Sequence, residues 1–436
     1  MSAGSELRLP ALTSFYTPPL PPAFAAMPVR FGVDVLLEKI RQSGARHEAW
    51  RRVGLVTNDA ARLATDSAQR TREALVRAGL PLHRLFGPEH GLVATEADGA
   101  AVHDRVDHLT GLPVISLYGE RMRPEPRHLA DLDVVLFDIP DVGARCYTYA
   151  WTLFHVLHAC AEARVSLVVL DRPNPLGGCP HAAEGPLLTE ACRSFIGDDD
   201  IPLRHSLTPG ELARLWQREH VADAMLDVVA CEGWERKRAW PAVGATWVPT
   251  SPAMPHFECA IWYTGTCLFE ATNLSVGRGT DLPFAQIGAP WLDASSLVAM
   301  CRDEALDAGA ELTMCTFTPS EGPHMGQVCH GVRLQCAPPR ARHETGSSDD
   351  AAWIAQHTSP VRLGLALLDG IARLQPEHFA WSRYPTAANP SGDDHFARLI
   401  GRDDLRERIG ALSPDDRREL TQVPGWRERT ATARLY

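Results

Sequence analysis

The stretch "DVVLFDIPDVGARCYTYAWTLFHVLHACAEARVSLVVLDRPNP" (133–175) decides the fold of this chain. It opens with a run of Val, Leu and Phe, passes through a helical segment at 148–163, and returns to a second apolar run that ends at Asp171. Apolar runs without alternation are typical of strands buried on both faces, as in a parallel sheet covered by helices. The stretch therefore predicts a βαβ unit of a doubly wound, Rossmann-like sheet.

The same alternation continues toward the N-terminus. Apolar runs at 52–58, 82–91 and 112–119 predict three more strands, and residues 65–79 predict a helix that Thr65 caps. After residue 200 the pattern becomes more mixed and indicates a further, smaller α/β unit. Residues 206–219 predict a helix with a capping box of Thr208 and Glu211, and residues 266–284 predict a short strand followed by a glycine-hinged loop. The expected fold class is α/β: a Rossmann-like parallel-sheet domain followed by a second, smaller C-terminal α/β domain.

The length of 436 residues exceeds what one ordinary core needs. We expect a disordered tail over residues 1–28, a Rossmann-like domain over 29–255 and the smaller domain over 256–436. Within the smaller domain, the Ser-, Asp- and Pro-rich residues 337–352 predict a mobile insertion.

Composition excludes several classes of protein. A formal charge of −11 disfavours nucleic-acid binding, and no apolar run is long enough for a membrane span. The 11 cysteines are odd in number and contain no CxxC pair, which favours reduced thiols and a cytoplasmic location. An AFAA stretch within residues 11–27 resembles a signal cleavage site, so a periplasmic or secreted protein is the alternative.

Familiar cofactor and nucleophile motifs are missing from the sequence. No GxGxxG or Walker pattern joins a strand to a helix, and neither a GxSxG elbow nor an HExxH pair occurs. We therefore expect no nucleotide cofactor, no serine nucleophile and no protein-bound metal.

Polar side chains follow each of the five expected strands at its carboxyl end, where sheets of this kind bind their ligands. In chain order these residues are Asn58, Glu89 with His90, Tyr118, Asp138 with Asp141, and Asp171 with Arg172 and Asn174. The coincidence predicts a polar pocket at this edge.

Glu89 lies in "FGPEHG" (86–91), a tight turn bracketed by glycines and a proline. A carboxyl group there can serve as a general acid or base, bind a ligand, or start a helix; His90 can equally brace the loop. Arg145 is expected just inside the helix that comes after Asp141, on the same face as Tyr149. If buried, it needs an anionic partner, either Asp138 or Asp141 or a substrate carboxylate.

Long motifs identify a family. "GLVTN", "GPEHG", "SLYG", "DVVLFDIPDVGARCYTYAWTL", "LDRPNPLGG", "TSPAMP" and "CLFEATNLSVGRGTDLPFAQIGAPW" occur in this order. They resemble the exo-β-N-acetylmuramidases of the NamZ type, once catalogued as a domain of unknown function, from about residue 30 to the C-terminus. The resemblance implies a glycoside hydrolase that releases non-reducing-end β-linked N-acetylmuramic acid from peptidoglycan fragments in cell-wall turnover and recycling. It also implies an active-site cleft between the two domains.

The resemblance places the proposed catalytic glutamate of the family at Glu89. Shielded on its turn, this residue could act as general acid with a raised pKa. The 2-acetamido group of the substrate can itself attack the anomeric carbon, and we expect Asp138 or Asp141 to orient it. If an ordinary carboxylate acts instead, the candidates are Asp138, Asp141, Glu184 and Glu270.

The lactyl ether of N-acetylmuramic acid carries a carboxylate, which calls for an arginine in the pocket. The candidates are Arg145, Arg172 and Arg278, with Arg145 preferred. The substrate-binding set is completed by Asn58, His90, Tyr118, Tyr149, Asp171, Asn174, Glu270 and Asn273, and stacking walls are sought among Trp247, Trp262 and Trp291. The alternatives are a β-N-acetylhexosaminidase for another amino sugar and a non-catalytic muropeptide-binding protein.

Overall fold

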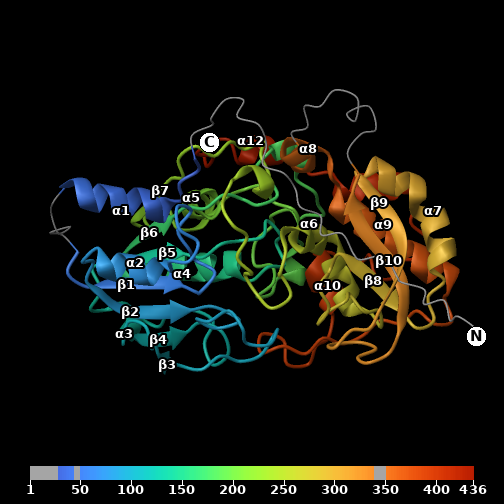
Figure 1. Cartoon of the computed structure of the whole chain (residues 1–436), viewed down its shortest axis with the longest axis horizontal. Coiled ribbons are helices and arrows are strands. Elements are labelled where there is room, and N and C mark those ends of the chain that lie inside the picture. Colours follow the sequence, from blue (N-terminus) through green and yellow to red (C-terminus); the bar gives the residue numbers. More distant parts are fainter. Residues whose placement is uncertain (1–27, 44–49, 338–349) are drawn as a thin grey trace, which may run out of the picture.

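A computed structural model describes residues 28–43, 50–337 and 350–436. The expected tail, apart from residue 28, and most of the expected insertion lie outside these residues. Figure 1 shows two sheets at opposite ends of the molecule, each with its own helices. The larger has seven strands in the order β3-β4-β2-β1-β5-β6-β7, and the smaller has three in the order β8-β10-β9.

The larger sheet is parallel except for the edge strand β3, which runs antiparallel to β4. Its strands are β1 (Val53–Thr57), β2 (Leu82–Gly87), β3 (Arg105–Val106), β4 (Pro113–Ser116), β5 (Val134–Asp138), β6 (Ser166–Leu170) and β7 (Leu226–Val229). The helices of this half are α1 (Gly32–Ser43), α2 (Thr71–Arg77), α3 (Pro126–Leu129), α4 (Tyr149–Ala163) and α5 (Pro209–His220), with short 3-10 helices η1 (Pro180–Ala182), η2 (Glu190–Cys192) and η3 (Trp240–Ala242).

The smaller sheet is antiparallel throughout. It contains β8 (Gln286–Ala289), β9 (Ala310–Phe317) and β10 (Cys329–Cys336). Around it lie α6 (Phe257–Thr266), η4 (Cys267–Ala271), α7 (Ala294–Asp307) and α9 (Pro360–Leu374). The remaining helices are α8 (Asp350–His357), α10 (His395–Ile400), α11 (Pro414–Thr421) and α12 (Trp426–Arg429), of which α8 and α12 contact η1 of the first half.

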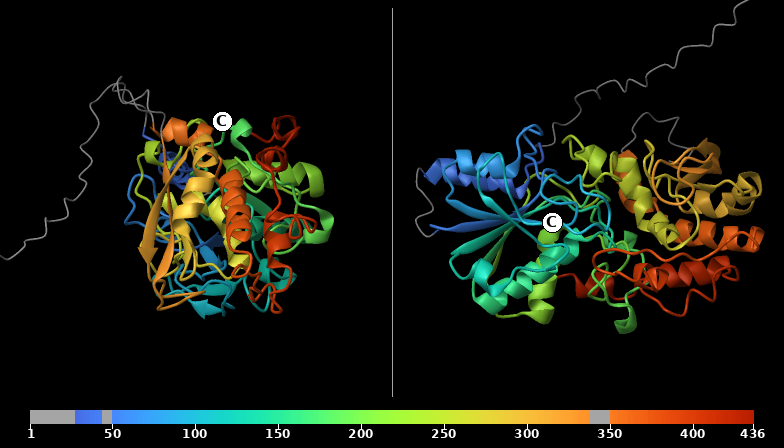
Figure 2. Two further views of the ribbon diagram at one scale, coloured as in Figure 1. Left: turned by 90° about the vertical axis from the view of Figure 1, so that its right-hand side faces the viewer. Right: turned by 90° about the horizontal axis from the view of Figure 1, so that it is seen from below.

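The central strands are buried on both faces, as their apolar runs predict. On β5, Val135 and Phe137 pack into one core with Trp151 of α4, whereas Val134 and Leu136 pack into a second core on the opposite face. Figure 2 (right) shows helices on both sides of the sheet. The α/β, Rossmann-like prediction is confirmed.

Two local predictions are wrong. The helix expected over 65–79 begins only at Thr71, because the Thr65 hydroxyl donates to Asp34 (2.8 Å) instead of capping the helix. The short strand expected within 266–284 is the 3-10 helix η4 followed by irregular chain. No helix of the described residues is long and apolar enough to cross a membrane.

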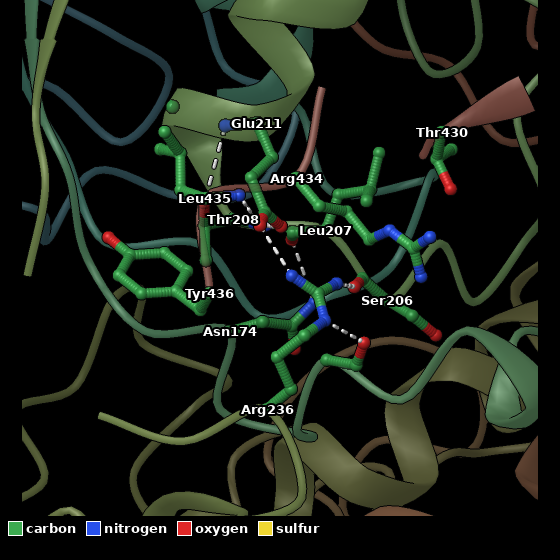
Figure 3. Close-up of polar contacts among 12 residues, drawn as sticks. Asn174, Ser206, Leu207, Thr208, Glu211, Arg236, Thr430, Arg434, Leu435 and Tyr436 are labelled. Atoms are coloured by element: carbon green, nitrogen blue, oxygen red, sulfur yellow. Dashed lines mark hydrogen bonds and ion pairs between the residues drawn. The ribbon is translucent and has the colours of Figure 1, made fainter. Parts of the chain in front are cut away.

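The last residues of the chain return to the larger sheet (Figure 3). The Leu435 amide donates to Glu211 (2.8 Å), which also pairs with Arg236. The Tyr436 hydroxyl donates to Asp171 at the end of β6 (2.6 Å) and accepts from the Cys231 amide (2.7 Å). These hydrogen bonds fix residues 435 and 436 against the end of β6 and the start of α5.

We expect Tyr436→Phe to lower the free energy of unfolding by about 1–3 kcal/mol at pH 7. Burial raises the pKa of Asp171 to about 6, so this carboxylate is mostly ionised at pH 7 and loses a charge-assisted donor in the variant. The ring itself still packs edge-on to Trp234. Chemical denaturation measures the difference, and a variant as stable as the wild type would show that the hydroxyl contributes nothing.

Candidate active site

A pocket with about 720 Å³ of empty space, part of it open to solvent, lies between the two halves of the molecule. The first half supplies loops that follow β2, β4 and β5, and the second half supplies η4, the loop after it and α10. Its polar lining includes Glu89, His90, Asp98, Tyr118, Thr148, Glu270, Arg278, Tyr384, His395 and Arg398.

Glu89 reaches this pocket because β2 ends in a tight turn. The backbone of His90 (φ 63°) and Gly91 (φ 71°) is left-handed, so the chain reverses directly after the glutamate. The Glu89 side chain then accepts one hydrogen bond from the Thr148 hydroxyl (2.7 Å) and one from the Gly99 amide (2.9 Å). Each carboxyl oxygen thus has a fixed partner, and the residue is 5% exposed.

Burial raises the pKa of Glu89, and the negative charge of Asp98 raises it further. The charge interaction with His90 and the hydrogen bonds donated by Thr148 and Gly99 lower the pKa of Glu89, but they do not cancel this rise. Glu89 is therefore biased toward the protonated form, which is the form that can donate a proton.

Asp98 lies beside Glu89 with the opposite bias. The Asp98 side chain is only partly buried, with 31% of its surface exposed. This partial burial disfavours the ionised form, but Arg278, His90 and the Tyr384 hydroxyl together hold the pKa of Asp98 below its ordinary value. Its Oδ2 accepts from Tyr384 (2.5 Å) and lies 3.3 Å from the Arg278 guanidinium. Its Oδ1 has no hydrogen-bond donor among the described residues. The pocket thus combines a protonated carboxyl group with an ionised one.

Arg278 joins the two acidic residues of the second half of the site. It pairs with Glu270 as well as Asp98, and its guanidinium stacks over Phe284 with 5.0 Å to the ring centroid. Burial raises the pKa of Glu270 to about 7. The positive charge of Arg278 is therefore already balanced by protein carboxylates.

Glu89, His90 and Asp98 each place one potential ligand atom within 4.8 Å of the others, close enough to surround a cation. Both oxygens of Glu89, however, already accept from Thr148 and the Gly99 amide, and the Oδ2 of Asp98 accepts from Tyr384 and pairs with Arg278. This arrangement fits a carboxyl pair with protein partners better than a metal site.

Of the residues predicted from the sequence, Glu89, His90, Tyr118, Glu270 and Arg278 line this pocket. Asp141 and Arg172 line a separate cavity of about 470 Å³, together with Trp240 and Trp247. The remaining predicted residues line neither cavity: Asn58, Asp138, Arg145, Tyr149, Asp171, Asn174, Glu184, Asn273, Trp262 and Trp291.

Neither Asp138 nor Asp141, which were expected to act with Glu89, lines the Glu89 pocket. Asp138 is completely buried and pairs with Arg172 and the Thr71 hydroxyl. Asp141 accepts from the Gly143 amide (2.8 Å) and contacts the His205 ring (3.2 Å). Both lie directly at the end of β5, whereas the residues of the same loop that line the Glu89 pocket, 146–148, come later in the chain.

The preference for Arg145 as a carboxylate-binding arginine is also wrong. Arg145 precedes α4, is completely buried, and donates to the carbonyls of Pro186 (2.8 Å), Ile201 (2.8 Å) and Leu399 (3.0 Å). Burial lowers its pKa. Backbone carbonyls thus take the place of the expected anionic partner, and Arg145 holds loops together.

Most other predicted binding residues also have structural partners. Asp171 accepts from Thr208, Asn174 donates to the Leu207 carbonyl, Asn58 accepts from the Ala60 amide, Tyr149 donates to the Thr250 carbonyl, Asn273 donates to the His378 carbonyl, and Glu184 accepts from the amides of Val361 and Arg362. These polar residues satisfy buried backbone and hydroxyl groups, which is the common role of buried polar side chains.

Sequence reasoning missed Asp98, Thr148, Tyr384, His395 and Arg398. Only Thr148 falls inside one of the quoted motifs, directly before the helix α4. The others lie on loops or on a short helix without any local pattern, and chain folding alone brings them to Glu89.

Comparisons with known proteins agree with this architecture. The chain matches the family model "Exo-beta-N-acetylmuramidase NamZ, N-terminal" over residues 53–258 and the corresponding C-terminal model over 261–436. It is 37% identical to the peptidoglycan β-N-acetylmuramidase NamZ of Bacillus subtilis strain 168 over 352 residues, which is 80% of this chain and 79% of that protein.

Two crystal structures from Bacteroides fragilis NCTC 9343, both described as DUF1343 family proteins, share the fold. One has a TM-score of 0.78 at 28% identity, and the other a TM-score of 0.63 at 23% identity. Both alignments cover 94% of this chain and 99% of the crystallised one. With both family models matched across the two halves that enclose the Glu89 pocket, the chain belongs to the NamZ family of exo-β-N-acetylmuramidases.

Proposed function

We propose that this protein is a glycoside hydrolase that releases β-linked N-acetylmuramic acid from the non-reducing end of peptidoglycan fragments. The observation that carries the proposal is a pair of carboxyl groups in one pocket with oxygens within 4.8 Å of each other, Glu89 with a raised pKa and Asp98 with a lowered one. Glycoside cleavage requires one carboxyl group that is protonated and one that is ionised, and the opposite pKa shifts of Glu89 and Asp98 provide both. The identity of the sugar, N-acetylmuramic acid, is inferred from the family to which the chain belongs.

In the first step, Glu89 donates its proton to the glycosidic oxygen as the bond to the anomeric carbon breaks. The acetamido oxygen of the substrate forms the new bond to that carbon and yields a cyclic oxazolinium ion. The Oδ1 of Asp98, whose Oδ2 is held by Tyr384 and Arg278, accepts the acetamido N–H and stabilises its developing positive charge.

In the second step, the Glu89 carboxylate takes a proton from water as the water oxygen attacks the anomeric carbon. The oxazolinium ring opens, and Glu89 is protonated again. The acetamido oxygen attacks the anomeric carbon with inversion in the first step, and the water attacks it with inversion in the second. The released sugar should therefore keep the β configuration.

A panel of nitrophenyl β-glycosides tests the proposed function. The N-acetylmuramic acid glycoside should be hydrolysed fastest, and proton NMR should detect the β anomer of the product before mutarotation. Faster cleavage of the N-acetylglucosamine glycoside would indicate a general hexosaminidase. Binding of muropeptides without turnover of any glycoside would indicate a binding protein.

The pH dependence of kcat/KM should be bell-shaped. Activity falls on the acid side as Asp98 becomes protonated, and this limb lies below the ordinary aspartate pKa of about 3.9. Activity falls on the alkaline side as Glu89 loses its proton, and this limb lies above the ordinary glutamate pKa of about 4.3. The two apparent values belong to the pair. A profile that stays flat across both limbs would contradict the assignment.

The eleven cysteines are all free, which supports a reducing compartment. We therefore place the reaction in the cytoplasm, on imported wall fragments that are being recycled. Cell fractionation that finds the active protein outside the cytoplasmic membrane would overturn this placement.

A further inference from the structure

Two arginines line the Glu89 pocket, Arg278 and Arg398. Arg278 is paired with Glu270 and Asp98. The guanidinium of Arg398, on helix α10, forms no hydrogen bond or ion pair with any residue that the structure describes. Arg398 is therefore the pocket's cation without an acidic protein partner.

His395 lies three residues before Arg398, so the two side chains share one face of α10. His395 is 6% exposed, and its Nε2 has no hydrogen-bond partner in the described part of the chain. Its ring stacks on Tyr384, with centroids 4.6 Å apart, and burial lowers its pKa to about 4. A neutral ring with an unsatisfied nitrogen beside an unpaired guanidinium is a polar site that is incomplete without a ligand.

We propose that Arg398, with His395 beside it, binds the carboxylate of the lactyl ether and so distinguishes muramic acid from glucosamine sugars. This inference rests on the proposed function. An anion taken from water into an enclosed pocket needs a charged hydrogen-bond donor, and a guanidinium presents the planar fork that fits a carboxylate. Arg278 is already committed to Asp98, whose charge the reaction uses.

The position of Arg398 agrees with this role. Arg398 and His395 line the Glu89 pocket and also a wider outer cleft, which Trp381 and Arg406 line as well. A lactyl group bound at Arg398 would therefore lie where the Glu89 pocket adjoins this second cleft.

The test compares Arg398→Ala with Arg406→Ala on two nitrophenyl β-glycosides, that of N-acetylmuramic acid and that of N-acetylglucosamine. Arg406 is the matched control because it lines only the outer cleft, where it stacks over Trp381. Arg398→Ala should lower kcat/KM for the muramic substrate roughly 10- to 100-fold, mainly through KM, and change the glucosamine substrate little. Arg398→Lys should recover part of the loss.

The outcomes separate the two proposals. Wild-type protein that does not hydrolyse the muramic glycoside refutes the proposed function itself. Wild-type activity together with an unchanged substrate ratio in Arg398→Ala overturns the carboxylate assignment alone. Equal losses on both substrates also overturn it, because a general structural role would not depend on the lactyl group. Matching thermal midpoints for the three variants establish that each is folded.

Discussion

Glu89→Gln should lower kcat on a muramic acid–glucosamine disaccharide roughly 10²- to 10⁴-fold, with little change in KM. The amide keeps the size of the side chain and can still contact Thr148 and the Gly99 amide. It has no proton to give to the departing sugar oxygen, which is a poor leaving group unless it is protonated. Steady-state kinetics on the purified variant measures the loss.

Glu96→Gln is the matched control. Glu96 follows the same turn and pairs with Arg105, but it does not line the pocket. It should retain nearly full activity. If Glu89→Gln loses no more activity than Glu96→Gln, another residue donates the proton.

Asp98→Asn alone should lower kcat roughly 10²- to 10³-fold, which is comparable with the loss of a charge-stabilising group in other active sites. The variant loses the anion that faces the acetamido nitrogen, while Arg278 still pairs with Glu270. Because the charge of Asp98 raises the pKa of Glu89, the alkaline limb of the pH profile should also move to lower pH. That shift is a readout that a merely structural role would not produce.

Asp104→Asn is the corresponding control, since Asp104 pairs with Arg121 near the surface and does not line the pocket. Its pH profile should match that of the wild type. An Asp98→Asn variant with wild-type kcat would assign the stabilisation of the cation to a different group, with Glu270 the next carboxylate of the pocket.

The sequence predicts the sheet well because its signal is local. The runs around Leu55 and Leu136 are apolar without alternation, and the strands they form are buried on both faces. Glu89 could be placed for the same reason: a turn after a parallel strand has a known location at the edge of the sheet. The capping box of Thr208 and Glu211 at the start of α5 is likewise a short-range pattern and is present.

The partners of Glu89 could not be predicted in this way. The contact between Asp98 and Tyr384 joins residues 286 positions apart, and neither lies in a regular element. Arg145 and Arg172 were plausible carboxylate ligands by spacing alone, but the folded chain provides carbonyls for one and Asp138 for the other. Which arginine stays unpaired depends on the whole fold.

The central claim, that Glu89 protonates the leaving oxygen, is tested most directly by a series of aryl β-glycosides of N-acetylmuramic acid with leaving groups of increasing pKa. The kcat/KM of the wild type should depend only weakly on the leaving group, because Glu89 protonates each of them as it departs. For Glu89→Gln, kcat/KM should be close to the wild-type value for the most acidic phenols and should fall steeply as the leaving-group pKa rises, because kcat/KM reports the first step alone. Equal slopes for the two proteins would contradict the claim.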